Sequence, residues 1–121
     1  MKKIFLICLS LIFVLCGCGE SSSKEGLISY MKAKELIINE GAVLVDVRTE
    51  EEYNEKHIDG ALLLTLDSIT EETAVALIND KESDIIVYCK SGKRSSEAKE
   101  KLENLGYTHV YDLGSIDNWE E

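Results

Sequence analysis

Residues 84–95 read DIIVYCKSGKRS, and the rest of the chain is best interpreted outward from this stretch. Its first part, 84–88, is an apolar run rich in β-branched residues, which is typical of a strand buried on both faces of a sheet. Residues 95–105 then repeat apolar side chains along one helical face and end before Gly106, a common helix stop. A strand that leads directly into a helix indicates a parallel α/β arrangement.

The same alternation of strand and helix runs along most of the chain. Helices are predicted over 30–38, 50–56, 95–105 and a segment capped by Thr70 that continues to Ile78; strands are predicted over 42–47, 84–88 and 109–112; 62–66 fits a strand or a loop, and 115–120 a last helical turn. We expect an α/β fold in which a central parallel sheet carries helices on both faces. At 121 residues there is room for one such domain, which we place at 27–121.

The first residues have a different character. Two lysines precede the apolar run 4–15, which is too short to span a bilayer but has the length of a signal-peptide core. The run ends at Leu15-Cys16-Gly17-Cys18, which resembles the bacterial lipobox. The resemblance implies a lipoprotein signal peptide over 1–17, a lipidated Cys18, a flexible tether over 18–26 and a lipid-anchored place on the extracytoplasmic face of the cell membrane. A plain secretory signal is the alternative.

Cysteine and charge counts narrow the chemistry. With the signal peptide removed and Cys18 lipidated, Cys89 is the one remaining thiol, so an internal disulfide is excluded. His57 and His109 are too few to complete a Cys/His zinc site, and we expect neither a metal nor another cofactor. The formal net charge of −10 argues against a nucleic-acid partner. The size of the single domain favours a monomer.

Cys89 is the first candidate functional residue because it directly follows the strand 84–88. In parallel α/β sheets, ligands collect at the carboxyl ends of the strands. A free thiol is mostly protonated at neutral pH, whereas the thiolate is the nucleophile. A nest of backbone amides from 90–95, together with the N-terminus of the next helix, would favour the thiolate.

The side chains of the same loop point to an anionic substrate. Lys90, Lys93 and Arg94 add positive charge, Gly92 permits the positive φ that a tight curl requires, and Ser91 and Ser95 offer hydroxyl donors. Together they predict that Cys89 is a nucleophile that attacks an anion. A buried structural cysteine surrounded by solvated lysines is the alternative.

At this point the residues resemble the rhodanese family in three segments. These are CKSGKRS at 89–95; DVRT at 46–49 with EY at 52–53 and HIDGA at 57–61; and LGSI at 113–116 followed by Trp119. The resemblance covers about residues 27–120. It implies a rhodanese-like α/β domain and sulfurtransferase activity through a cysteine persulfide. The chain departs from the family pattern at Lys56 and Ser115, where glycine is usual, which puts the local backbone shape in doubt.

The resemblance also assigns roles by position. It makes Cys89 the persulfide carrier, uses the amides of 90–95 to bind the terminal sulfur, and uses Arg94 with the two loop lysines to hold the donor. Asp46 and Arg48 are expected in a polar network beneath the loop, and whether Arg48 contacts substrate stays open. Three further residues are interpreted as structural: His57, His109 and Trp119.

The expected reaction is transfer of a sulfane sulfur from an anionic donor such as thiosulfate to cyanide or a thiol. Phosphatase or arsenate reductase chemistry is the nearest enzymatic alternative, because relatives on a similar fold carry it out. Their loops place five residues between cysteine and arginine, whereas four residues, 90–93, separate Cys89 from Arg94, which suits one sulfur atom better than a phosphate. A membrane-tethered binding domain without turnover is the third alternative.

Overall fold

The computed structural model describes residues 26–120. The predicted signal peptide, Cys18 and all of the predicted tether except its last residue lie outside the described residues. Within 26–120, no helix is long and apolar enough to cross a membrane.

A four-stranded parallel sheet forms the centre of the domain. Its strands are β1 (Val43–Asp46), β2 (Leu62–Leu63), β3 (Asp84–Cys89) and β4 (His109–Ser115), in the spatial order β2-β1-β3-β4. All three neighbouring pairs run parallel, so the four carboxyl ends meet at one edge of the sheet. The register between β3 and β4 shifts by one residue, because Val87 pairs with Asp112 whereas Tyr88 pairs with Gly114.

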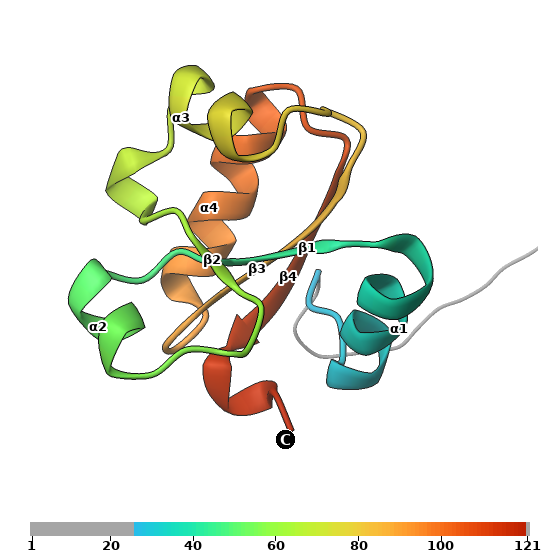
Figure 1. The fold of residues 1–121 in the computed structure, drawn as a ribbon, viewed down its shortest axis with the longest axis vertical. Coiled ribbons are helices and arrows are strands. Elements are labelled where there is room, and N and C mark those ends of the chain that lie inside the picture. The colour runs from blue at the N-terminus through green and yellow to red at the C-terminus, as the bar shows by residue number, and fades with distance from the viewer. Residues whose placement is uncertain (1–25, 121) are drawn as a thin grey trace, which may run out of the picture.

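Helices cover both faces of this sheet, as predicted. Figure 1 shows α1 (Tyr30–Glu40) on one side and α3 (Glu71–Leu77) with α4 (Lys93–Asn104) on the other, while α2 (Glu50–Glu55) lies near the carboxyl edge. Alternate residues of β3 enter two separate cores: Ile85, Val87 and Cys89 face α3 and α4, and Ile86 and Tyr88 face α1. The apolar run 84–88 is therefore explained by burial on both faces.

Local sequence signals fix the helix ends. Ser29 caps α1 by accepting a hydrogen bond from the Lys32 amide, and Gly41 ends that helix in the left-handed conformation. Thr49 and Glu52 form a reciprocal capping box at the start of α2. A capping box also begins α3, which places that helix where the sequence predicted it.

Several boundaries differ from the sequence prediction. The segment 62–66 contributes a two-residue strand, since β1 offers Val45 and Asp46 as parallel partners. Helix α4 begins at Lys93 rather than Ser95, because Gly92 adopts φ 100° and ends the preceding loop early. Strand β4 extends to Ser115 rather than 112, and the last turn is a short 3₁₀ helix, η2 (Ile116–Asn118).

Candidate active site

Cys89 is the last residue of β3 and lies at the carboxyl edge of the sheet. Two backbone amides donate hydrogen bonds to its sulfur: Gly92 N lies 2.9 Å and Ser95 N 3.3 Å from Sγ. The two amides thus direct hydrogen-bond donors at Sγ, an arrangement that suits an anion at this position. Cys89 is fully buried in this structure.

The curl of the loop after β3 depends on Gly92. Its φ of 100° lies in the left-handed region that side-chain-bearing residues rarely adopt. This conformation turns the Gly92 amide back toward Sγ and directs the first turn of α4 at the same atom. Ser95 is buried in that turn, and its hydroxyl donates to the Gly92 carbonyl over 3.1 Å. The Ser95 hydroxyl, which was predicted to be a donor, thus donates to the loop backbone, whereas the Ser95 amide donates to Sγ.

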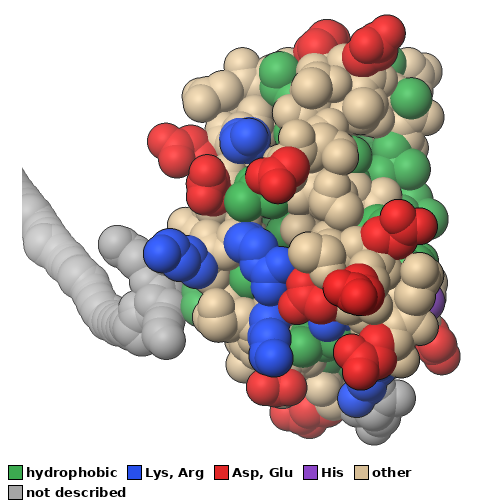
Figure 2. Space-filling view, turned by 90° about the vertical axis from the view of Figure 1, so that its left-hand side faces the viewer, with side chains coloured by type: hydrophobic (Ala, Val, Ile, Leu, Met, Phe, Trp, Pro, Cys, Tyr) green, Lys and Arg blue, Asp and Glu red, His purple; other side chains and the backbone are tan. Residues whose placement is uncertain are grey.

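The remaining polar side chains of the loop are exposed to solvent. Lys90, Ser91 and Lys93 are all exposed. Figure 2 shows the face that carries α2 and this loop, where Lys and Arg side chains gather with Asp and Glu side chains close around them. Lys90 shares a pocket lining with Glu52, Glu55 and Asp117, so acidic groups lie near this cation of the loop.

Arg94 has a partner that the sequence did not indicate. Its Nη1 lies 2.8 Å from Glu52 Oε1, and its Nη2 donates to Glu52 Oε2 over 3.2 Å. This pair, together with the Thr49 amide, lowers the pKa of Glu52 to about 2. In the free protein, the guanidinium expected to hold an anionic donor is thus occupied by a carboxylate of α2.

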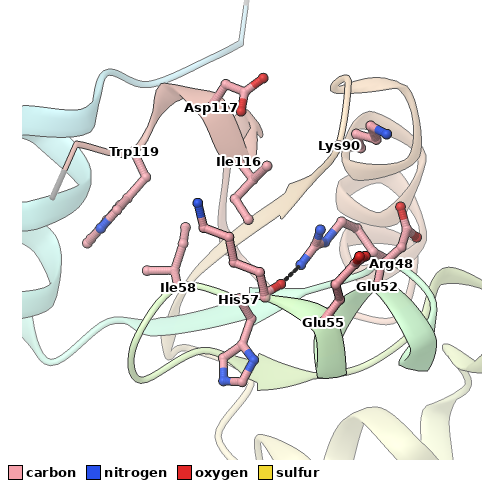
Figure 3. Close-up of a pocket in the computed structure, with 10 residues that line it drawn as sticks. Arg48, Glu52, Glu55, His57, Ile58, Lys90, Ile116, Asp117 and Trp119 are labelled. Atoms are coloured by element: carbon pink, nitrogen blue, oxygen red, sulfur yellow. Dashed lines mark hydrogen bonds between the residues drawn. The ribbon is translucent and has the colours of Figure 1, made fainter.

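Asp46 and Arg48 form a buried polar network at the carboxyl end of β1. The Asp46 carboxylate accepts the Arg48 backbone amide at 2.8 Å and its side-chain Nε and Nη2 at 2.8–3.1 Å. Arg48 Nη2 also donates to the Lys56 carbonyl at 2.5 Å, as the dashed line in Figure 3 shows. Hydrogen bonding to Asp46 raises the pKa of Arg48, and the bond from Arg48 to Lys56, the C-cap of α2, ties the end of that helix to the end of β1.

The two departures from the family pattern have different consequences. Lys56 has φ −170° and ψ 135°, an extended conformation open to any residue, so glycine is not required there. The Ser115 hydroxyl donates to the Lys90 carbonyl at 2.6 Å and accepts the Asp117 amide at 3.0 Å. Ser115 therefore ties the reactive loop to the end of β4.

Two buried residues support the site without having been singled out in the sequence. The Tyr88 hydroxyl accepts the Ile58 amide at 3.1 Å and so fixes the segment after α2. Burial raises the pKa of Asp112, whose carboxylate accepts the Gly114 amide at 2.8 Å. Both residues lie in largely apolar strands, where a buried polar group needs a hydrogen-bond partner. That position was the signal in the sequence that could have identified them.

His57 and Trp119 border the site but also have structural contacts. His57 Nδ1 lies 2.7 Å from the Tyr53 carbonyl, and its ring stacks on that of Tyr53 with centroids 3.7 Å apart. Figure 3 shows the imidazole directed away from the space between Trp119 and Lys90. Trp119 packs edge-on against Tyr30 at a centroid distance of 5.0 Å. His109 is exposed at the start of β4, at the opposite end of that strand from Ser115.

A pocket of about 580 Å³ opens beside the reactive loop at the carboxyl edge of the sheet (Figure 3). Ten residues line it: Arg48, Glu52, Glu55, Lys56, His57, Ile58, Lys90, Ile116, Asp117 and Trp119. Among residues 26–120, no group of three or more His, Cys, Asp and Glu side chains is arranged to hold a metal ion. The described site thus combines one buried thiol, converging amides and a charged pocket.

Comparison with known proteins identifies the family. Residues 29–121 match the family model for a rhodanese-like domain. Thiosulfate sulfurtransferase PspE of Escherichia coli is 36% identical over 93 residues, which covers 77% of this chain and 88% of that protein. Thiosulfate sulfurtransferase GlpE of Coxiella burnetii is also 36% identical over 93 residues, with 76% and 84% covered.

Solved structures agree with the sequence relatives. A structure described as a rhodanese with anions from Escherichia coli has a TM-score of 0.60 and 35% identity, and the match covers 64% of this chain and 89% of that one. The predicted fold class is confirmed by this likeness. On its motifs, its sheet and these relatives, the chain belongs to the family of rhodanese-like domains.

Proposed function

We propose that this rhodanese domain transfers a sulfane sulfur from an anionic donor such as thiosulfate to a thiophilic acceptor, with Cys89 as the persulfide carrier. The observation that carries the proposal is the pair of amides, Gly92 N and Ser95 N, at 2.9 and 3.3 Å from Sγ. The relatives named thiosulfate sulfurtransferase support the enzyme class. No metal or organic cofactor is required by this chemistry.

The first half-reaction loads the sulfur. The Cys89 thiolate attacks the sulfane sulfur of thiosulfate, a new S–S bond forms to Sγ, and the S–S bond of thiosulfate breaks so that sulfite leaves with its electron pair. Charge balances, because a thiolate and a dianion become a persulfide anion and a dianion. Arg94 and the loop lysines stabilise the donor once Arg94 exchanges its Glu52 partner for the incoming anion.

The second half-reaction unloads it. The outer sulfur of the persulfide anion first takes a proton from solvent, and an acceptor nucleophile then attacks that sulfur. The bond between the two sulfurs breaks, Sγ leaves as a thiolate that the Gly92 and Ser95 amides stabilise again, and the product returns the proton to solvent. Cyanide yields thiocyanate by this route, and a thiolate yields a new persulfide. The enzyme returns to its starting state without an external oxidant or reductant.

The size of the loop distinguishes sulfur transfer from phosphoester hydrolysis. In this structure the Gly92 and Ser95 amides contact Sγ itself, and four residues separate Cys89 from Arg94 in the sequence. A tetrahedral oxyanion needs several inward-facing donors around a wider cradle. The geometry therefore favours a single transferred sulfur atom over a phosphate or arsenate.

A direct test uses the purified protein with thiosulfate and cyanide and follows thiocyanate. We expect turnover, and a mass gain of one sulfur atom on Cys89 after treatment with thiosulfate alone. Cys89→Ser should lose both signals. Turnover that persists in Cys89→Ser, or cleavage of a phosphoester with no thiocyanate formed, would refute the proposal.

We also propose that the domain acts from a lipid anchor at Cys18, on the extracytoplasmic face of the membrane. Support comes from the apolar run 4–15 and the lipobox-like Leu15-Cys16-Gly17-Cys18. Two acyl chains would hold the protein stably at a bilayer. Radiolabelled palmitate should enter the wild-type protein but not Cys18→Ala, and a Cys18→Ala protein that is still labelled and membrane-bound would contradict this location.

A further inference from the structure

The two strands that flank β3 carry the same local motif near their carboxyl ends. In β1 the Asp46 carboxylate accepts the amide of Arg48 at 2.8 Å, and in β4 the Asp112 carboxylate accepts the amide of Gly114 at 2.8 Å. An aspartate that binds the amide two residues further on holds the backbone in a turn-like shape. The strand that carries Cys89 therefore lies between two strands whose ends are shaped by a buried aspartate.

Asp112 has no arginine partner of the kind that Asp46 has. Its side chain belongs to a residue that is only 4% exposed, yet it forms no ion pair within residues 26–120. Burial raises the pKa of Asp112, and hydrogen bonds from the Ser95 side chain and the Gly114 amide offset part of that effect. Both of these donors belong to segments that contact the reactive loop, so we followed each of them to the thiol.

Ser95 connects Asp112 to one of the two amides at the sulfur. Its side chain is a hydrogen-bond partner of Asp112, and its backbone amide donates to Cys89 Sγ at 3.3 Å. The hydroxyl also lies 3.1 Å from the Gly92 carbonyl, so Asp112 and that carbonyl share one proton donor. Ser95 is fully buried in the first turn of α4, and these contacts hold that turn against β4 and the loop.

Gly114 connects Asp112 to the other amide. The pairing of β4 with β3 shifts by one residue between Asp112 and Gly114, and Gly114 has φ 85°. A methyl group added to Gly92 would lie 3.6 Å from the Gly114 Cα, so the two glycine backbones are close neighbours. The Gly92 amide is the nearer donor to Sγ, at 2.9 Å. By binding the Gly114 amide, Asp112 fixes the backbone against which the curl of the loop rests.

We propose that Asp112 is a positioning residue for sulfur transfer, which acts through Ser95 and Gly114 to keep the Ser95 and Gly92 amides directed at Cys89 Sγ. The kinetic part of this inference rests on the proposed sulfur transfer, whereas its geometric part holds without turnover. Asp112 is not among the residues that line the pocket beside the reactive loop. Its effect on the reaction is therefore transmitted by the two amides.

Three substitutions separate the hydrogen bonds of Asp112 from its charge. Asp112→Val and Asp112→Thr have nearly the same shape and both suit a strand, but only threonine has an oxygen that can accept the Gly114 amide. Asp112→Asn keeps a good acceptor and removes the charge. The backbone carbonyl of residue 112 accepts the Ile28 amide at 2.9 Å, and this bond survives all three substitutions.

The turnover of the variants should follow the strength of the acceptor at position 112. We expect thiocyanate formation to fall by about tenfold in Asp112→Val, because a misplaced amide donor at a reacting atom costs at least that much. The loss should be about threefold in Asp112→Thr, whose hydroxyl is a weaker acceptor, and less than about twofold in Asp112→Asn. Rescue by asparagine and threonine would show that the hydrogen bonds carry the effect.

Amide hydrogen exchange followed by NMR gives a readout that needs no turnover. In Asp112→Val the Gly92 and Ser95 amides should exchange about tenfold faster, beyond any change shared by the whole domain. The amides of Leu36 in α1 and Val45 in β1 report that shared change. A residue with a merely structural role would speed all four amides by the same factor, whereas a positioning residue affects the pair at the sulfur selectively.

The two measurements separate this inference from the proposed function. Selective exchange in a protein that forms neither thiocyanate nor a persulfide would refute the proposed function and leave the role of Asp112 in holding the amides intact. Wild-type turnover with unchanged exchange in folded Asp112→Val would overturn the inference alone, and so would a loss of turnover in which all four amides exchange faster together. If Asp112→Val does not fold, equal turnover and equal exchange in Asp112→Thr and Asp112→Asn would overturn it.

Discussion

The contact between Arg94 and Glu52 makes a sharp prediction about donor use. In the free protein both guanidinium Nη atoms of Arg94 are engaged by the Glu52 carboxylate, at 2.8 and 3.2 Å. An anionic donor must displace that carboxylate before it can use Arg94. Glu52→Gln should therefore raise kcat/KM for thiosulfate, because a neutral amide competes less well for the guanidinium.

The expected size follows from the exposure of the pair. The side chains of Arg94 and Glu52 are 33% and 26% exposed, so solvent screens much of their attraction. Pairs of this kind are worth up to about 1 kcal/mol, and the two-point geometry places this one near the upper end. Releasing that energy gives an increase of about fivefold in kcat/KM for thiosulfate.

The substitution is well suited to the question because glutamine preserves the second role of Glu52. Its Oε1 accepts the Thr49 amide at 3.0 Å in the capping box of α2, and glutamine serves equally in that position. Glu51→Gln, on an exposed position of the same helix, is the matched control and should leave kcat/KM unchanged. Steady-state kinetics with thiosulfate varied at fixed cyanide measures the effect on the first half-reaction.

The pH dependence gives a second check on the same pair. Since Arg94 and Thr49 lower the pKa of Glu52 to about 2, Glu52 stays ionised through the neutral and mildly acidic range. The ratio of variant to wild-type kcat/KM should thus be constant between about pH 5 and pH 8. The stability contributed by the pair is present above the ordinary carboxyl pKa of 4.5 and is lost as the pH falls toward 2. An unchanged or lower kcat/KM in a fully folded Glu52→Gln protein would refute this account of the pair.

Three further substitutions test the loop and the buried polar groups. Gly92→Ala places a side chain at φ 100°, which costs about 1–2 kcal/mol and displaces the amide 2.9 Å from Cys89 Sγ; thiocyanate formation should fall at least about tenfold while circular dichroism stays native. Burial raises the pKa of Asp112, so Asp112→Asn should increase the free energy of unfolding in urea by about 1 kcal/mol at pH 7. This gain should vanish at a pH low enough to protonate Asp112 in the wild-type protein, and a decrease in the free energy of unfolding at pH 7 would contradict the burial argument. Tyr88→Phe leaves the Ile58 amide without its acceptor and should cost about 1–2 kcal/mol in the same measurement, and no change would show that the 3.1 Å bond contributes nothing.

Local features of the sequence were sufficient to predict the architecture and to single out Cys89. The apolar run 84–88, the helix caps and the alternation of elements predicted a parallel α/β sheet, since each depends on residues close together in the chain. The position of Cys89 at a strand end followed from the same pattern. The short segment 62–66 stayed ambiguous because two strand residues carry no periodicity, and pairing with β1 decided its structure.

The tertiary structure decided which groups from distant parts of the sequence come together near Cys89. The sheet order β2-β1-β3-β4 brings together the ends of strands that lie far apart in sequence, and with them Glu52 and Arg94, which are 42 residues apart. The bond from Ser115 to the Lys90 carbonyl and the ten-residue pocket arise in the same way. The sequence shows which side chains are available for chemistry. Which of them pair and which are buried depends on their neighbours in three dimensions. The partner of Arg94 and the mixed charge of the pocket therefore become visible only once the strands are in place.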